Sequence, residues 1–105
     1  MGRVSLKTDI NGRALQSLTP STTSVNGTIG GSSVRLAIPT GATVIRVSAS
    51  GDCYLEFGDV TVVAASTDML FPTGVEIFTL DPAWTHVALI QSGTSTGTLS
   101  ITEMT

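Results

Sequence analysis

Few residues of this sequence could carry out chemistry. It contains one histidine, His86, and one cysteine, Cys53. A Ser–His–Asp mechanism would have to use His86, and the fold alone would have to bring one of the twelve serines to it. His86 follows Trp84 and Thr85 at the head of a β-rich run. We therefore expect a structural imidazole, partly packed at a turn, and no enzymatic activity.

Cys53 alternates with Leu55 and Phe57, which predicts a small buried hydrophobe rather than a nucleophile. A reactive thiolate needs a neighbouring base or cation, whereas the neighbour here is Asp52, whose charge raises a thiol pKa. One cysteine and one histidine do not fill a zinc site. The aspartates lack the Asp-x-Asp spacing of a calcium loop, and most flank predicted turns. We expect no bound metal and no cofactor.

The composition describes one small globular domain with a sparse charge. The chain has 105 residues, of which 41% are hydrophobic and 12% are charged, with a formal net charge of −3. That apolar share suffices for a folded core. Nucleic-acid binding needs clustered cations, and the five here are scattered, so we expect no nucleic-acid partner. They are Arg3, Lys7, Arg13, Arg35 and Arg46.

The N-terminus and the hydropathy pattern predict a protein that is soluble and made in the cytoplasm. No continuous apolar region follows Arg3, so the start of the chain does not resemble a signal peptide. No window approaches the run of about 18 apolar residues that a membrane helix needs. With Cys53 as the single cysteine, an intrachain disulfide is excluded.

Short β-rich runs alternate with turn residues from Val34 to the C-terminus. Within them apolar side chains recur with the period of two that is typical of half-buried strands, and no stripe has helical spacing. We expect at most one helical turn, over residues 65–68. The predicted strands are 34–38, 44–49, 53–57, 60–64, 69–71, 75–80, 86–91 and 98–102.

Eight short strands separated by turns predict an all-β, single-domain sandwich over residues 33–105. The sequence does not fix the strand order, so jelly-roll and immunoglobulin-like topologies both remain open. Residues 1–32 hold only isolated apolar positions between Thr-, Ser- and Gly-rich stretches, although short strands are expected near Leu6 and Ala14. We interpret residues 1–32 as an N-terminal arm or edge segment, and we expect the β-core to fold without it.

The five aromatic residues divide by strand parity. Phe57 and Phe71 are predicted to lie in the core. Tyr54 and Phe78 have the other parity and are candidates for contact with a partner or another subunit. Trp84 precedes a strand, where its ring either covers the end of the sandwich or anchors a neighbour.

Several short motifs resemble small β-rich virion proteins of tailed bacteriophages. The resemblance covers about residues 34–105, and it rests on the order of a Cys-Tyr-x-x-Phe-Gly strand, a Leu-Pro-x-Gly turn and a terminal Gly-Thr-Leu strand. Phe71 stands where that pattern has an aliphatic residue before the proline. The matching runs are Cys53–Gly58, Ser66–Gly74, Glu76–Phe78, His86–Gln91, Gly97–Leu99 and Thr102–Glu103.

The resemblance implies a structural protein of the virion, at the capsid surface or associated with the head. Such a cement or decoration protein braces the shell through protein–protein contacts and needs no chemistry. Its implied partners are the major capsid protein, other virion proteins and further copies of itself, with a trimer favoured. The alternative is a tail- or fibre-associated module that recognises a host surface glycan or a partner protein.

Overall fold

The structure, a computed structural model, describes residues 6–8, 14–16 and 20–104. Every regular element in this part of the chain is a β-strand. β1 and β2 pair with each other as a small hairpin, in which Leu6 lies opposite Gln16. The strands are β1 (Leu6–Thr8), β2 (Ala14–Gln16), β3 (Pro20–Ile29), β4 (Val34–Ala37), β5 (Val44–Ala49), β6 (Cys53–Gly58), β7 (Met69–Phe71), β8 (Gly74–Thr79), β9 (His86–Gln91) and β10 (Gly97–Met104).

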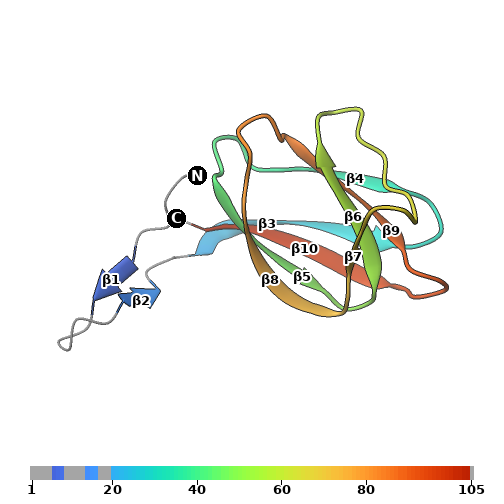
Figure 1. Cartoon of the computed structure of the whole chain (residues 1–105), viewed down its shortest axis with the longest axis horizontal. Coiled ribbons are helices and arrows are strands. Elements are labelled where there is room, and N and C mark those ends of the chain that lie inside the picture. Colours follow the sequence, from blue (N-terminus) through green and yellow to red (C-terminus); the bar gives the residue numbers. More distant parts are fainter. Residues whose placement is uncertain (1–5, 9–13, 17–19, 105) are drawn as a thin grey trace.

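Strands β3 to β10 form two four-stranded antiparallel sheets packed face to face (Figure 1). One sheet has the order β3-β10-β5-β8 and the other has the order β4-β9-β6-β7. Each connection crosses from one sheet to the other, except the one between β6 and β7. This strand order is that of an eight-stranded jelly roll and differs from the immunoglobulin arrangement. The all-β sandwich is thus confirmed, and the topology left open by the sequence is a jelly roll.

Strand β3 places the start of the sandwich earlier than the sequence predicts. Residues 20–29 pair with β10 along most of its length, and Ile29 is fully buried in the core. The inward-facing positions are Val25, Gly27 and Ile29, so glycine interrupts the apolar alternation. A Cβ at position 27 would crowd the side chain of Leu36 in the opposite sheet, which explains the glycine. The boundary expected at residue 32 is therefore wrong, because β3 belongs to the sandwich.

The predicted strand at 60–64 is also wrong, because this segment lies in the long loop between β6 and β7. Local side-chain bonds hold the loop: Thr61 N–H donates to Asp59 Oδ1 over 2.8 Å. The loop then reaches β4, where Ala64 N–H donates to Ser33 Oγ over 2.9 Å. It thus crosses β9, whose outward-facing Ala88 is fully buried. The expected turn at 65–68 is present as a single bonded turn.

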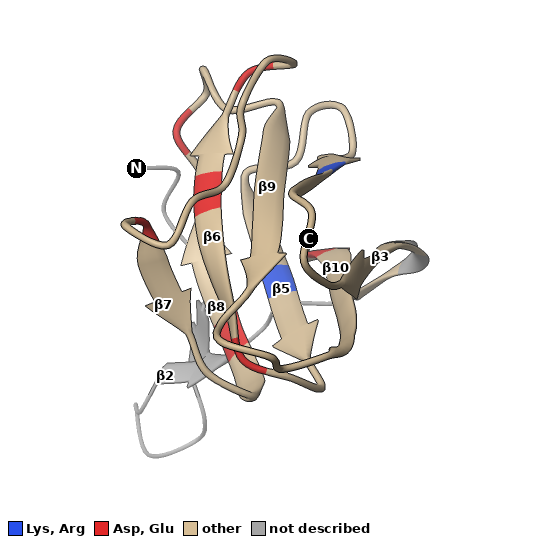
Figure 2. Cartoon of the chain, turned by 90° about the vertical axis from the view of Figure 1, so that its right-hand side faces the viewer, with Lys and Arg blue, Asp and Glu red and all other residues tan. Residues whose placement is uncertain are grey.

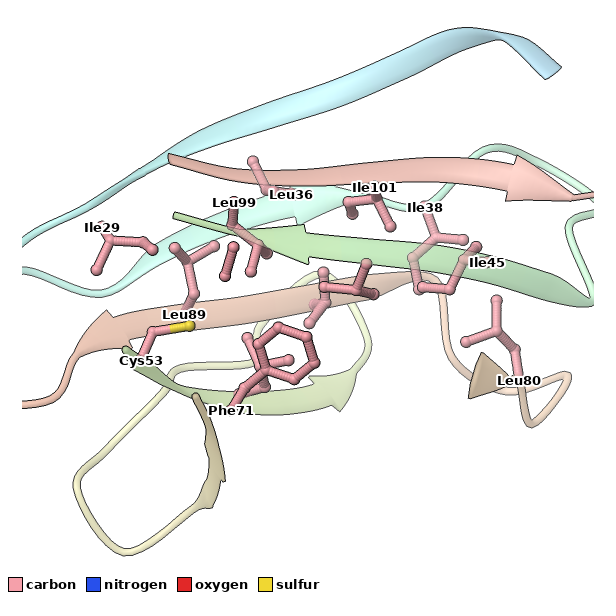
Figure 3. Packing of buried hydrophobic residues seen from close by; sticks show 14 residues of the cluster. Ile29, Leu36, Ile38, Ile45, Cys53, Phe71, Leu80, Leu89, Leu99 and Ile101 are labelled. Atoms are coloured by element: carbon pink, nitrogen blue, oxygen red, sulfur yellow. The ribbon is translucent and has the colours of Figure 1, made fainter. Parts of the chain in front are cut away.

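The core lies between the sheets and is built from the faces that the alternation predicts (Figure 3). The other seven predicted strands agree with the structure to within two residues at each end. Leu55 retains 2% of its exposure, and Phe71 retains the same fraction. The cluster contains Ile29, Leu36, Ile38, Ile45, Val47, Ala49, Cys53, Leu55, Phe71, Leu80, Val87, Leu89, Leu99 and Ile101.

Candidate binding surfaces

His86 occupies the first position of β9, where it is half-buried. Its Nδ1 lies 2.9 Å from the hydroxyl of Thr85. Residues Gly93–Gly97 match the Gly-x-Ser-x-Gly pattern of a nucleophile elbow, which sequence reasoning missed. That stretch joins β9 to β10, whereas a nucleophile elbow joins a strand to a helix. Ser95 also lies beyond the far end of β9 from His86, so the fold does not bring the two residues together.

Cys53 is fully buried among the core side chains, as the sequence predicts. Burial, with a smaller effect from the charge of Asp52, raises the pKa of the thiol to about 11. Both influences disfavour the thiolate, which is the nucleophilic form. Cys53 therefore fills space between the sheets (Figure 3).

We expect the Cys53 thiol to resist modification in the folded protein. With its pKa raised from 9.0 to about 11, the thiolate fraction near neutral pH falls by about a hundredfold even before steric protection. Reaction with Ellman's reagent should be slow under native conditions and fast in guanidinium chloride. If the thiol of the folded protein reacted with the reagent as fast as a free thiol, the buried position of Cys53 would be contradicted.

Several aspartates in the described residues accept hydrogen bonds that hold turns and loops. No group of three metal-binding side chains is found among residues 6–8, 14–16 and 20–104. Glu56 shares a hydrogen bond with Asp68, and this contact raises the pKa of Glu56. Asp59 bonds both the N–H and the hydroxyl of Thr61, which lowers the pKa of Asp59. The expected turn role of the aspartates is seen directly at Asp52, Asp59 and Asp81.

Asp52 connects three loops at one end of the sandwich. Its Oδ1 accepts hydrogen bonds from Thr73 N–H (2.8 Å) and from the Thr73 hydroxyl (3.0 Å). Its backbone carbonyl accepts a bond from Ser92 N–H over 3.1 Å. The bonds from Thr73 hold the pKa of the Asp52 carboxyl below its ordinary value of 3.8.

The lowered pKa of Asp52 predicts an acid-sensitive contribution to stability. A carboxyl whose pKa is lower in the folded state stabilises the fold above its unfolded pKa, and the contribution is lost as pH falls through the folded pKa. The urea midpoint of the wild type should therefore be higher than that of Asp52→Asn at neutral pH. The two midpoints should converge below pH 3.8. A difference that stays constant down to strongly acidic pH would show that the Asp52 charge does not cause it.

The two arginines of residues 20–104 lie on different strands (Figure 2). Arg35 lies on β4 in one sheet, and Arg46 lies on β5 in the other. Arg35 Nη1 donates to the carbonyl of Val62 over 3.3 Å and so helps to hold the β6–β7 loop. No helix long and apolar enough to cross a membrane occurs in the described residues.

The three aromatic residues expected to contact a partner occupy different places. Tyr54 is half-buried on the outer face of its sheet, opposite Ile90 and Leu70 of the neighbouring strands. Phe78 packs against the core, with its ring 5.5 Å from that of Phe57. Trp84 is 37% exposed after β8. Tyr54 and Trp84 thus remain candidates for partner contact, whereas we assign Phe78 to internal packing.

A set of exposed apolar side chains, which sequence reasoning missed, lies on β7 and β8. β7 and β8 are edge strands, joined by a short turn. Their exposed apolar side chains are Met69, Leu70, Val75 and Ile77, and we call this set the apolar edge. Between 41% and 53% of each side chain is accessible. Alternation within β8 gave a hint, because Val75 and Ile77 have the parity opposite to Phe78.

A cavity of about 410 Å³ opens at the end of the sandwich near the start of β9. Its walls come from the β4–β5 loop, the β8–β9 loop and the adjoining strand ends. Ile38 and Leu80 are its buried apolar residues, and Trp84 and His86 also line it. We call this space the end cavity. Its volume lies in the range of natural small-molecule sites.

Comparisons of the chain with models of protein families, with curated protein sequences and with solved structures find no match. No residue of this chain therefore takes a role from a relative. The assignment of function depends on the apolar edge, the end cavity and the motifs of the sequence.

Proposed function

We propose that this chain is a structural virion protein of a tailed bacteriophage, which decorates or braces the capsid through protein–protein contacts. The observation that carries the proposal is the apolar edge, because four large apolar side chains remain exposed on two adjoining edge strands. Large apolar side chains that stay exposed in numbers along neighbouring strands often mark interaction sites. The motifs shared with small phage virion proteins supply the kind of partner, and jelly rolls are common in viral shells.

The apolar edge offers two kinds of contact to a partner. Its side chains lose accessible apolar surface on docking, which favours association. Strand β8 also presents one row of backbone groups outward, since β5 is its sole ladder neighbour among the described strands. Natural edges are commonly protected by charged side chains, proline or a bulge, and β8 carries one such device, the charge of Glu76. A neighbouring subunit can therefore add contacts without any rearrangement of the sandwich.

Binding to a preassembled shell stabilises that shell by mass action. A ligand that binds the assembled lattice and not its free subunits shifts the equilibrium toward the lattice. No catalytic group is needed for this role. The phage resemblance implies a homo-oligomer, with a trimer favoured. Each oligomer would make several contacts with the lattice at once, which strengthens binding.

The first experiment asks whether the apolar edge mediates association. The paired change Val75→Thr and Ile77→Thr keeps β-branched residues in the strand and removes apolar surface. Light scattering should show an oligomer for the wild type and a smaller mass for the double variant. Val63→Thr, at a 64% exposed position in the β6–β7 loop, is the matched control and should keep the wild-type mass. An unchanged oligomer in the double variant would exclude the apolar edge as the contact surface.

The second experiment asks where the protein resides. An antibody against this chain should label the heads of phage particles released by the bacterium that carries the coding sequence. The purified chain should also sediment together with those capsids, and the apolar-edge double variant should do so less. Labelling of tails alone would favour the fibre- or tail-associated binding module. Absence of the chain from purified particles would refute both proposals.

A further inference from the structure

The end cavity has walls that are fixed before any ligand arrives. Backbone bonds tie its two loops to neighbouring segments: Ile38 N–H donates to the carbonyl of Thr85 over 2.9 Å, and Leu80 N–H donates to that of Thr43 over 2.8 Å. The β8–β9 loop is further held by Asp81, whose Oδ1 accepts a bond from Ala83 N–H over 2.8 Å. A preformed site loses little conformational entropy when it binds a ligand.

Trp84 supplies the cavity with an oriented aromatic ring. The indole stacks on Phe57, with ring centroids 5.0 Å apart and an interplanar angle of 19°. Phe57 is in turn packed against the core, so the indole rests on a rigid base. Trp84 nevertheless keeps 37% of its surface accessible and lines the cavity. This arrangement provides a platform for a flat ligand surface.

The lining of the end cavity disfavours ionic ligands. His86 is the sole ionisable side chain among the residues that line the cavity, and neither arginine nor lysine is present there. A phosphate or carboxylate would therefore enter a mainly apolar space that holds neither arginine nor lysine, at a high desolvation cost. The ligand that fits is uncharged.

Polar groups on the lining nevertheless offer hydrogen bonds. Thr40, Thr43 and Thr85 contribute hydroxyl groups, and each hydroxyl can donate and accept. The Nδ1 of His86 is engaged by the Thr85 hydroxyl. Within residues 20–104, the other ring nitrogen, Nε2, has no hydrogen-bond partner. One aromatic platform beside several neutral hydrogen-bonding groups matches a ring with an apolar face and a rim of hydroxyls.

We propose that the end cavity binds a neutral sugar residue, with its C–H face on Trp84 and its hydroxyls toward the threonines and His86. A proline-rich peptide is the competing ligand for a site with tryptophan, but such peptides dock in grooves lined by several aromatic residues. Trp84 is the sole aromatic ring in this lining apart from His86. The sugar site goes beyond the capsid role, and its test does not require that the protein be found on a virion.

The sequence provides a built-in reporter, because Trp84 is its single tryptophan. We would titrate the full-length chain with D-glucose, D-galactose, N-acetyl-D-glucosamine and L-rhamnose, and follow tryptophan emission. At least one neutral sugar should shift the emission in a saturable way. N-Acetylneuraminic acid, which carries a carboxylate, should cause no saturable shift. An amide NMR titration with the same sugars should place the perturbed signals in the two cavity loops.

Variants distinguish the end cavity from binding elsewhere. Trp84→Leu, followed by NMR, should weaken binding by roughly tenfold, as expected for the loss of one stacking platform. Thr43→Val removes one hydroxyl without changing side-chain shape and should weaken binding by roughly 2- to 10-fold. Thr94→Val makes the same change in the β9–β10 loop, at the other end of the sandwich, and should bind like wild type.

Three results would overturn the sugar site. The first is the absence of saturable change with all four neutral sugars by both fluorescence and NMR. The second is sugar binding that Thr43→Val leaves at wild-type strength, a test that does not depend on Trp84→Leu folding. The third is saturable binding of an octaproline peptide in the end cavity without sugar binding, which would assign the site to a peptide.

Discussion

Replacing Leu55 with alanine is expected to lower the free energy of unfolding by about 2–5 kcal/mol, the usual cost of deleting a buried leucine side chain. Leu55 retains 2% of its exposure and lies opposite Leu89 and Met69 on the neighbouring strands. Its side chain points between the two sheets, which are held by ladders of backbone bonds. The space left by the lost methyl groups can therefore close only in part.

The matched control is Val63→Ala, in the β6–β7 loop and outside the apolar edge. Val63 is 64% exposed, so its truncation should change the unfolding free energy by no more than about 0.5 kcal/mol. Urea denaturation followed by circular dichroism measures both variants under the same conditions. Equal midpoints for Leu55→Ala and wild type would show that Leu55 faces outward and that the register of β6 is wrong.

The sequence predicts most of the sandwich because strand alternation depends on which face is buried. Ile45, Val47 and Ala49 on β5, and Leu99 and Ile101 on β10, all lie in the core as expected. A period of two is recognisable in each of these strands, since these inward positions all carry apolar side chains. Local patterns do not contain the pairing between strands, and for this reason they left the jelly-roll order open.

The two errors in the fold have specific physical causes. In β3 the inward position 27 is glycine, because Leu36 of the other sheet approaches closely, and two apolar residues alone do not make a recognisable pattern. In the segment 60–64 the β-branched valines favour a strand, but the bonds of Asp59 turn the chain. Val60 and Val63 then remain 58% and 64% exposed. In both cases a tertiary contact or a side-chain cap outweighs the local propensity.

The binding surfaces were less predictable than the fold. Tyr54 and Trp84 were identified as surface aromatics, but Phe78 packs inward, because it lies opposite the core residue Ile45 on β5. Its ring meets those of Phe57 and Phe71. The end cavity brings together residues 37–43 and 80–86, which are distant in the sequence. The pairing of β9 with β4 and the pairing of β8 with β5 place these two segments together.

Deleting residues 1–32 is expected to abolish the cooperative fold. The shortened chain would lose β3, whose backbone bonds β10 from Gly97 to Met104, and it would lose the fully buried Ile29. β10 would then become an edge strand, and the core side chains of Leu99 and Leu36 would be exposed to water. A small domain has a net stability of about 5–15 kcal/mol, so losing the contacts of a whole strand removes most of that stability. Far-UV circular dichroism and a thermal melt of the truncated chain measure this outcome.

A chain that begins at Pro20 is the control, because it keeps all eight strands of the two sheets. We expect it to melt cooperatively, with the β-sheet spectrum of the full-length protein. If the chain that begins at residue 33 also melts cooperatively with that spectrum, β3 is dispensable, and the N-terminal boundary of the sandwich lies where the sequence alone had predicted it. If neither truncated chain folds, residues 1–19 are required for the sandwich. Cooperative melting of the Pro20 chain alone would confirm that the sandwich begins with β3.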